Sequence, residues 1–255
     1  MKAVILAGGL GSRISEETYL RPKPMVTIGE KPILWHIMKK FSLHGVRDFV
    51  ICLGFKGEVI REYFLNFRSY SSTFTIQTKS GDVELLQDNC EDWAVTLVDT
   101  GSTSNTGERL KRVREYLGKE SFFFTYGDGL TSQDLNKTSS YHETTQKLVT
   151  LTAVNPPARY GAVSVTSGIV ESFSERTSSP ESLINGGYFV VGAGIFEVLE
   201  RFSNPSWEVD VLPILAKQND LAAYVHPGFW FAMDTLRDKE HLENLLECGS
   251  VPWLR

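Results

Sequence analysis

Residues 2–13 read Lys-Ala-Val-Ile-Leu-Ala-Gly-Gly-Leu-Gly-Ser-Arg, and this stretch decides the fold. Its first half is an apolar run, typical of a strand buried on both faces of a parallel sheet. Glycines follow at the carboxyl end of the strand, where open parallel sheets bind their ligands. Gly8, Gly9 and Gly11 can expose backbone N–H groups to an anion. The loop is therefore a candidate anion site, although glycines are equally typical of a turn with positive φ angles.

Two common phosphate-binding patterns are absent from this loop. The P-loop pattern G-x-x-x-x-G-K-[ST] does not occur, and Ile14 stands where a dinucleotide fingerprint has its third glycine, which disfavours a hydride-transferring enzyme. Arg13 can nevertheless hold a phosphate as a planar fork. Further along, Lys23 lies between Pro22 and Pro24, which stiffen the backbone around it. A lysine fixed in this way is more typical of a binding site than of a solvated surface.

The rest of the first half alternates strand-like and helical segments. This alternation predicts a mostly parallel, Rossmann-like sheet with crossover helices on its faces. The polar segment 66–92 interrupts it and predicts a hairpin or another excursion from the sheet. In chain order, the sequence predicts strands at 2–7, 48–53, 94–99, 121–126 and 148–154, and helices at 31–44, 57–64, 107–117 and 132–143.

The segments become shorter after Pro156 and Pro157. Strand-like pieces at 162–166, 169–173 and 188–192 predict a small antiparallel addition rather than a new domain. No internal repeat or low-complexity linker divides the chain, so we expect one mixed α/β domain over residues 1–255. The remaining segments predict helices near 194–201, 208–218 and 235–248 and a strand near 221–226.

Composition limits the class of partner. The net charge of −5 over 255 residues disfavours non-specific binding to nucleic acid or to an anionic membrane. No apolar stretch reaches the length of a membrane span, and the first residues lack the features of a signal peptide, so we expect a cytoplasmic protein. Cys52, Cys90 and Cys248 form no C-x-x-C pair, and we interpret them as buried free thiols.

Several segments spread along the whole chain resemble one enzyme family. The pattern G-G-x-G-S-R at 8–13, followed by Lys23-Pro24 and by Gly-Glu-Lys-Pro-Ile-Leu at 29–34, resembles the sugar-nucleotide pyrophosphorylase superfamily of nucleotidyltransferases. More closely, the chain resembles the glucose-1-phosphate cytidylyltransferases. The resemblance implies a nucleotide-binding part at 1–130 and an acceptor-binding part at 131–255. The matching segments are 31–38, 98–101, 106–113, 125–129, 184–187, 228–230 and 233–239.

This resemblance implies transfer of CMP from CTP to a phosphorylated acceptor, most simply glucose 1-phosphate, with release of pyrophosphate. The acceptor phosphate is largely ionised near neutral pH, because its second pKa is about 6, and no catalytic base is required. Catalysis then depends on positioning and on neutralising negative charge. The resemblance also implies a homo-oligomer. Residues 66–92 could be a lid over the nucleotide or an interface arm.

Asp128 and Asp234 are the ligands that the resemblance implies for Mg²⁺, the expected cofactor. Mg²⁺ favours one or two carboxylates together with phosphate oxygens and water. The sequence alone also allows simpler roles for both residues. Asp128 could be a turn residue between Gly127 and Gly129, and Asp234 could be the N-cap of the helix that follows it.

The same resemblance implies the contacts to the nucleotide. Lys23 would contact the triphosphate and stabilise the negative charge that develops on it, and Arg13 would bind the β- and γ-phosphates. These two residues and the two aspartates are the implied catalytic set. Arg109 would read a base carbonyl; the alternative is a solvated charge on a helix. Glu108 stands where the family has glycine, which leaves the choice of base open. The implied nucleotide-binding residues are Leu6, Ala7, Gly8, Gly9, Gly11, Ser12, Arg13, Lys23, Ser104, Arg109 and Gly127.

The acceptor side departs from the family. Arg176-Thr177 stand where the family has Lys-Pro, so the charge is kept on a planar fork and the stiffening proline is lost. This leaves open a non-sugar acceptor such as an amino-acid phosphate, an alcohol phosphate or a phosphonate. A nucleotide-sugar glycosyltransferase, which usually carries Asp-x-Asp, and a non-catalytic nucleotide binder are more distant alternatives. The implied acceptor-binding residues are Arg159, Tyr160, Gly161, Glu175, Arg176, Asn185 and Gly186.

Overall fold

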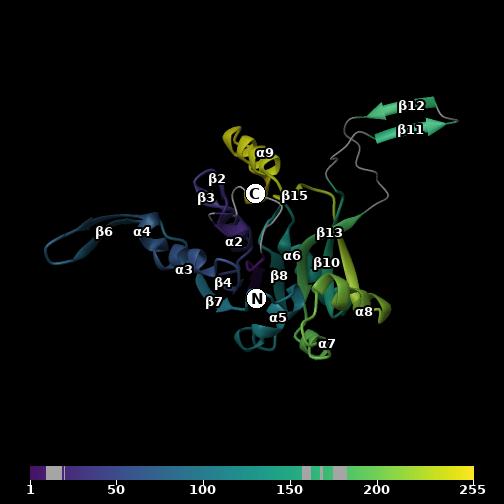
Figure 1. The fold of residues 1–255 in the computed structure, drawn as a ribbon, viewed down its shortest axis with the longest axis horizontal. Coiled ribbons are helices and arrows are strands. Elements are labelled where there is room, and N and C mark those ends of the chain that lie inside the picture. The colour runs from purple at the N-terminus through teal and green to yellow at the C-terminus, as the bar shows by residue number, and fades with distance from the viewer. Residues whose placement is uncertain (10–18, 20, 157–161, 167–168, 175–182) are drawn as a thin grey trace.

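A single seven-stranded sheet forms the centre of the computed structural model, which describes residues 1–9, 19, 21–156, 162–166, 169–174 and 183–255 (Figure 1). All neighbouring strands are parallel except β13, which runs antiparallel to both of its neighbours. The mixed, mostly parallel sheet predicted from the alternation is therefore confirmed. The strand order is β14 (Leu221–His226), β10 (Val149–Val154), β13 (Ile184–Val191), β8 (Phe122–Tyr126), β1 (Ala3–Leu6), β4 (Asp48–Leu53) and β7 (Ala94–Asp99).

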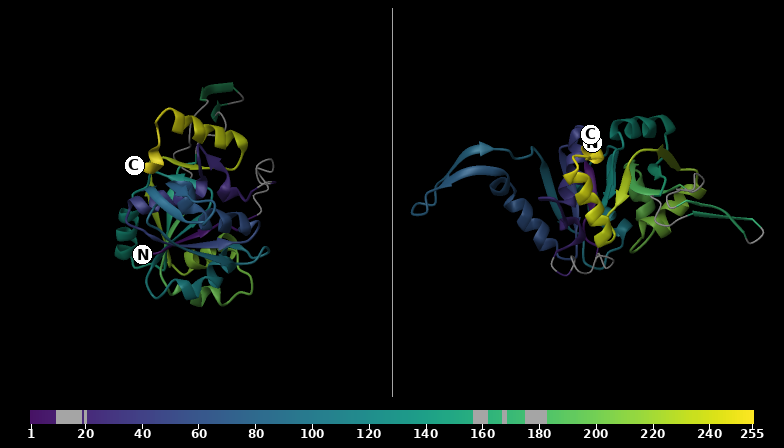
Figure 2. Two further views of the ribbon diagram at one scale, coloured as in Figure 1. Left: turned by 90° about the vertical axis from the view of Figure 1, so that its left-hand side faces the viewer. Right: turned by 90° about the horizontal axis from the view of Figure 1, so that it is seen from above.

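Helices cover both faces of this sheet (Figure 2). The side chains of β1 alternate between two apolar clusters, with Ala3 and Ile5 in one and Val4 and Leu6 in the other. β1 is thus buried on both faces, as its apolar run predicts. The first face packs against α2 (Ile33–Leu43), α3 (Gly57–Leu65), α6 (Leu135–Thr145) and α9 (Leu236–Glu247), and the second against α5 (Thr106–Arg112), α7 (Ile195–Leu199) and α8 (Leu212–Lys217).

Three predicted segments differ from the structure. The helix expected over 107–117 ends at Arg112 and continues as a 3-10 turn, Arg114–Tyr116. The helix expected over 208–218 begins as a π-helix, Trp207–Val211, before α8. The strand expected at 188–192 belongs to the central sheet as β13, because its side chains are apolar on both faces and enter both clusters. Of the predicted antiparallel addition, β11 (Ala162–Thr166) and β12 (Ile169–Ser174) remain as a separate pair.

The predicted excursion at 66–92 is a helical turn, α4 (Phe67–Ser71), followed by a hairpin of β5 (Ser72–Ile76) and β6 (Val83–Asp88). The hairpin projects from the body as an arm, seen in blue in Figure 1. It carries exposed apolar side chains, including Phe74, Ile76 and Leu86. Short ladders elsewhere pair β2 (Thr27–Ile28) with β3 (Lys31–Pro32) and β9 (Gly129–Thr131) with β15 (Trp230–Ala232).

The cysteines are free thiols, as predicted, but their burial differs from the prediction. Cys52 on β4 is buried, and burial raises the pKa of its thiol to about 12. Cys90 is half-buried and Cys248 is exposed, because both lie outside the two apolar clusters. In the described part of the chain, every helix is too short or too polar to cross a membrane.

A buried histidine gives the fold a dependence on pH. The indole N–H of Trp253 donates to Nδ1 of His36 at 3.2 Å, so Nδ1 carries no proton, and Nε2–H can donate to the carbonyl of Ile28 at 3.1 Å. Protonation would place a second hydrogen against the indole N–H. Burial lowers the pKa of His36 and outweighs the opposing effect of the Ile28 carbonyl.

We expect stability to fall as the pH is lowered below about 6.5, the ordinary histidine pKa, because the unfolded chain then binds protons that the folded chain excludes. The free energy of unfolding in urea, measured at pH 7.5 and at pH 5.5, gives the slope. The variant His36→Gln, which keeps a donor and an acceptor, should lower that slope. Part of the slope should remain, because burial also lowers the pKa values of His142 and His226. An unchanged slope in the variant would contradict this account.

Candidate active site

A cavity of about 590 Å³ opens at the carboxyl ends of β1 and β8. Open parallel sheets bind ligands at this edge. Predicted nucleotide-binding residues from both strand ends face it. Its lining is Leu6, Ala7, Gly9, Lys23, Pro24, Ser104, Asn105, Thr106, Arg109, Tyr126, Gly127, Asp128, Ser206, Glu208 and Asp234.

A second cavity of about 240 Å³ adjoins the first. Both cavities are lined by Tyr126, Asp128 and Asp234, which therefore lie where the two meet. The predicted acceptor residues Asn185 and Gly186 line the second cavity. The side chain of Asn185 donates to the Tyr126 hydroxyl at 3.4 Å and accepts from the backbone N–H of Gly187 at 2.9 Å. Two ligand pockets thus share one charged wall.

Lys23 joins the two predicted metal ligands. Its Nζ lies 2.6 Å from Oδ2 of Asp128 and 2.8 Å from Oδ1 of Asp234. Burial alone would lower the pKa of Lys23, but the charges and hydrogen bonds of the two carboxylates outweigh it and hold the pKa above its ordinary value. The ammonium group and the two carboxylates, far apart in the sequence, form one ion-pair cluster at the junction of the cavities.

This cluster fits a divalent metal ion. Two carboxylate oxygens converge on one cationic atom, and Mg²⁺ accepts one or two carboxylates at about 2.0–2.1 Å, with phosphate and water completing its coordination. The described residues contain no cluster of three or more His, Cys, Asp or Glu side chains that could hold a metal by itself. The donor set therefore suits an ion that arrives with a phosphorylated substrate.

Local backbone structure places the cluster. Lys23 opens a 3-10 turn, Lys23–Met25, and the ring of Pro24 lies against Gly127. A Cβ on Gly127 would stand 2.5 Å from the carbonyl oxygen of Leu6, so only glycine lets the end of β8 approach β1 this closely. Pairing of β9 with β15 brings the two aspartates together. The backbone N–H of Met233 also donates a hydrogen bond to the Asp128 carbonyl at 2.9 Å.

The simpler role considered for Asp234 is wrong. Thr235, not Asp234, is the N-cap of α9, and it forms a capping box with Asp238. The carboxylate of Asp238 also accepts from the backbone N–H of Asp234 at 3.0 Å, which leaves the side chain of Asp234 directed to Lys23. Asp128 does lie in the bend between β8 and β9, as its simpler role as a turn residue predicts, and its carboxylate also accepts from the same ammonium group.

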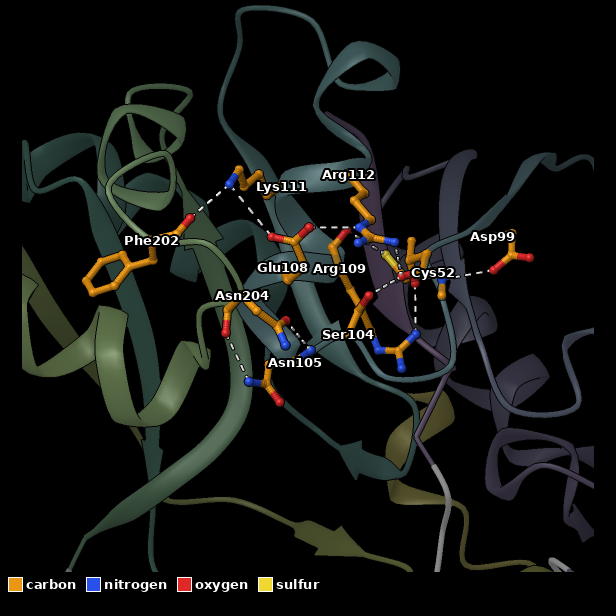
Figure 3. Close-up of polar contacts among 12 residues, drawn as sticks. Cys52, Asp99, Ser104, Asn105, Glu108, Arg109, Lys111, Arg112, Phe202 and Asn204 are labelled. Carbon is orange, nitrogen blue, oxygen red and sulfur yellow. Dashed lines mark hydrogen bonds and ion pairs between the residues drawn. The ribbon is translucent and has the colours of Figure 1, made fainter.

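Arg109 is buried, so its interpretation as a solvated helix charge is wrong (Figure 3). Its Nη1 donates to the Leu53 carbonyl at 3.1 Å and to the Thr100 hydroxyl at 2.9 Å. Its Nη2 donates to the Gly8 carbonyl at 3.0 Å. The guanidinium thus ties the glycine loop after β1 to the loop after β4 while it lines the cavity. The hydroxyl of Ser104, also on the cavity wall, donates to the Thr100 carbonyl.

Glu108 is not among the residues that line the cavity, and Figure 3 shows its carboxylate facing the basic side chains of Lys111 and Arg112. Its Oε1 accepts from Nε of Arg112 at 2.8 Å, and its Oε2 lies 3.8 Å from Nζ of Lys111. The buried Glu108 therefore pairs with two basic side chains of its own helix and does not line the cavity. Its effect on the choice of base stays a prediction.

Arg109→Lys is expected to reduce the free energy of unfolding by about 1–3 kcal/mol, because buried carbonyl and hydroxyl acceptors lose their donors. Arg112→Lys on the same helix is the matched control, since that side chain is about half exposed and its loss should cost no more than about 1 kcal/mol. Urea unfolding of both variants measures the difference. Equal losses would contradict the assignment of Arg109 as the buried tie between the loops.

Several predicted site residues lie outside the described residues: Gly11, Ser12 and Arg13 on the nucleotide side, and Arg159, Tyr160, Gly161, Glu175 and Arg176 on the acceptor side. Their roles stay predictions. Gly8 is described, and its carbonyl also accepts from the N–H of Phe55 at 3.2 Å. Among the described residues, no residue of 66–92 lines either cavity, so the arm does not act as a lid in this conformation.

Tyr126, Ser206, Glu208 and Trp230 are among the cavity residues that the sequence did not predict. The indole N–H of Trp230 donates to the Gly186 carbonyl at 2.6 Å and so closes the acceptor cavity. Tyr126 and Trp230 lie inside segments that match the family, which was a usable signal. Ser206 and Glu208 offered none, because their approach to α5 depends on the tertiary fold.

The mostly parallel sheet and the two adjoining cavities at its strand ends are those of an α/β protein that binds small ligands at this edge. The sequence profile described as nucleotidyl transferase matches residues 2–237, and the chain belongs to this family. The chain is 51% identical to the glucose-1-phosphate cytidylyltransferase of Salmonella typhimurium, covering 99% of this chain and 98% of that protein. It is 41% identical to the probable glucose-1-phosphate cytidylyltransferase of Bacillus subtilis, covering 99% of each.

Solved structures share the fold at low sequence identity. The UTP-bound UGPase of Acinetobacter baumannii superposes with a TM-score of 0.70 at 19% identity, covering 99% of this chain and 95% of that one. A UDP-glucose pyrophosphorylase complexed with UDP-glucose also gives a TM-score of 0.70, at 18% identity, covering 97% and 98%. These likenesses confirm the nucleotidyltransferase fold predicted from the sequence.

Proposed function

We propose that this protein transfers CMP from CTP to glucose 1-phosphate and releases pyrophosphate. The observation that carries the proposal is the junction of two cavities at Lys23, Asp128 and Asp234. A nucleoside triphosphate in the larger cavity and a sugar phosphate in the smaller one would meet at this wall. The identity of 51% to a named glucose-1-phosphate cytidylyltransferase supports CTP and glucose 1-phosphate as the two substrates.

The reaction is an in-line displacement at the α-phosphorus. An oxygen of the acceptor phosphate forms the new P–O bond, the bond to the β-phosphate oxygen breaks, and pyrophosphate leaves with the electron pair. The acceptor oxygen is already ionised, so the site needs no base, in keeping with the lysine and carboxylates found there. The ammonium of Lys23 is placed to stabilise charge on the α-phosphate.

We propose Mg²⁺ as the cofactor, held by Asp128 and Asp234. When bound, it would reduce the repulsion between the two phosphates as they approach. The two carboxylates would then exchange Lys23 for the metal ion, which frees the ammonium to contact the nucleotide.

Steady-state pyrophosphate release with Mg²⁺ tests the proposal. We expect the highest kcat/KM for CTP with glucose 1-phosphate, and lower values for UTP, ATP, GTP and dTTP. The acceptor panel should include an amino-acid phosphate, an alcohol phosphate and a phosphonate, because Arg176-Thr177 replace the family Lys-Pro. Turnover with only one of those acceptors would show that it, and not glucose 1-phosphate, is the substrate. Absence of turnover with every acceptor would refute the proposed reaction.

A further inference from the structure

One carboxylate on the wall of the nucleotide cavity has no part in the cluster around Lys23. Glu208 belongs to the π-helix Trp207–Val211, which lies before α8. Its Oε1 accepts from the Tyr126 hydroxyl at 2.5 Å, and its Oε2 accepts from the hydroxyl groups of Thr106 at 2.7 Å and Ser206 at 3.1 Å. Three hydroxyl donors from three separate segments thus fix one carboxylate at the edge of the cavity.

The support behind Glu208 is rigid. Trp207 is fully buried between Phe124 and Phe189, and its backbone N–H donates to the Thr106 hydroxyl at 2.8 Å. The Ser206 hydroxyl accepts from the Val209 N–H at 3.3 Å and so caps the π-helix. Single π-turns occur frequently at functional sites, where they redirect a side chain. The anchored backbone therefore holds Glu208 in place before any ligand binds.

The charge of Glu208 decides what it can bind. Among the described residues, no lysine or arginine forms an ion pair with Glu208, and its exposed carboxylate is held by hydroxyl groups instead. An ionised carboxylate has about four acceptor positions, of which the three hydroxyls use three. A phosphate would be repelled there, whereas a neutral hydroxyl donor would occupy the remaining position on Oε1.

The location of Glu208 selects the part of the substrate. It lines the nucleotide cavity, and it bonds to Tyr126, which lines both cavities and also contacts Asn185 of the acceptor cavity. The phosphate-binding groups lie on the wall formed by Lys23 and the two aspartates. The wall at Glu208 therefore faces the uncharged, hydroxyl-bearing parts of the substrates.

We propose that Glu208 recognises a sugar hydroxyl, either on the ribose of the nucleotide or on the acceptor sugar, and so orients that ring relative to the phosphates. The proposal rests on the proposed function, which supplies both rings. A neutral hydroxyl group could donate to Glu208, whereas the negative charge of Glu208 would repel the triphosphate from this wall of the cavity. The carboxylate would thus set the direction in which the nucleotide enters the cavity.

Calorimetric binding to the full-length wild type and to Glu208→Gln tests the proposal. The ligands are CTP, 2′-deoxy-CTP, 3′-deoxy-CTP, glucose 1-phosphate and its deoxy analogues. Loss of the recognised hydroxyl should weaken wild-type binding by roughly tenfold to a hundredfold, since the bond involves a charged acceptor. The same loss should change the Kd of Glu208→Gln by less than about threefold, because the neutral amide oxygen of glutamine is a weaker acceptor than the carboxylate.

If the Glu208→Gln change abolishes the penalty for losing a ribose hydroxyl, Glu208 contacts the nucleotide. If it abolishes the penalty for losing a hydroxyl of the sugar phosphate, Glu208 contacts the acceptor. Equal penalties in wild type and variant for every analogue would overturn the proposal. Asp210→Asn is the matched control, since Asp210 accepts from the Ser206 N–H at 2.7 Å in the same π-helix but does not line the cavity. It should keep the wild-type penalties, and the same loss of coupling in Asp210→Asn would reduce Glu208 to a structural role.

The binding test of Glu208 can fail or succeed independently of the turnover test of the proposed reaction. Binding of CTP and its deoxy analogues is measured without turnover, so coupling between Glu208 and a ribose hydroxyl stands even if glucose 1-phosphate proves to be the wrong acceptor. Conversely, normal turnover of CTP and glucose 1-phosphate with no coupling to any hydroxyl would overturn the role of Glu208 and leave the reaction intact.

Discussion

Asp128→Asn and Asp234→Asn are each expected to lower kcat by about a thousandfold, the scale of losing a charged group that acts on the transition state. Each change keeps the size of the side chain and removes one of the two negative charges that converge on the junction of the cavities. Because both carboxylates serve one cation, the double variant should be little worse than either single variant. Initial rates of pyrophosphate release at saturating substrates give the comparison.

Asp48→Asn is the control for this pair. Asp48 is exposed at the start of β4, at the opposite end of the strand from the cavity, and the change should leave kcat unchanged. All variants should keep a cooperative unfolding transition. A kcat within tenfold of wild type for either Asp128→Asn or Asp234→Asn would contradict a shared metal site, and so would multiplicative losses in the double variant.

Lys23→Met is expected to lower kcat by about a hundredfold or more, because a cation that stabilises charge on the α-phosphate is lost. A second effect distinguishes this variant from the aspartate variants. Without nucleotide, Lys23 stands between the two carboxylates, so a divalent ion must displace it. We therefore expect Lys23→Met to bind Mn²⁺ more tightly than wild type when no nucleotide is present, as measured by electron paramagnetic resonance of free Mn²⁺.

Thermal unfolding supplies an independent readout for Lys23→Met. Removal of the ammonium leaves Asp128 and Asp234 facing each other without the cation that pairs them, so the variant should unfold at a lower temperature in EDTA. Mg²⁺ should restore the Tm of the variant more than it raises that of wild type. Lys31→Met, on the short strand β3, is a control that lies outside the cavity. Weaker Mn²⁺ binding by Lys23→Met than by wild type would contradict the displacement.

The local patterns of the chain predicted the sheet and the position of the site well. The apolar run before Gly8 is a strand in the centre of the sheet, and the Pro-Lys-Pro segment does aim Lys23 at the cavity. Both patterns are short-range consequences of side-chain size and backbone restriction, so a sequence displays them directly. The resemblance then linked Asp128 and Asp234 before any distance between them was known.

Long-range geometry accounts for what the sequence did not predict. In the sequence, Arg109 resembles Lys111 and Arg112, the other basic residues of the same helix, and only the folded chain shows that α5 buries Arg109 against the end of β4. Glu208 lies about one hundred residues from Thr106 and is joined to it by a hydrogen bond. No periodicity encodes such a contact, because it arises when two helices on the same face of the sheet pack together.

Isotopic labelling of the phosphorus atoms of CTP tests directly whether the protein transfers CMP to the sugar phosphate. The protein would be incubated with Mg²⁺, glucose 1-phosphate and CTP labelled either at the α- or at the γ-phosphorus, and the products separated. We expect the α label to appear in a sugar nucleotide in the same amount as the γ label appears in pyrophosphate. Label in CMP or inorganic phosphate, with no labelled sugar nucleotide, would contradict nucleotidyl transfer to the sugar phosphate.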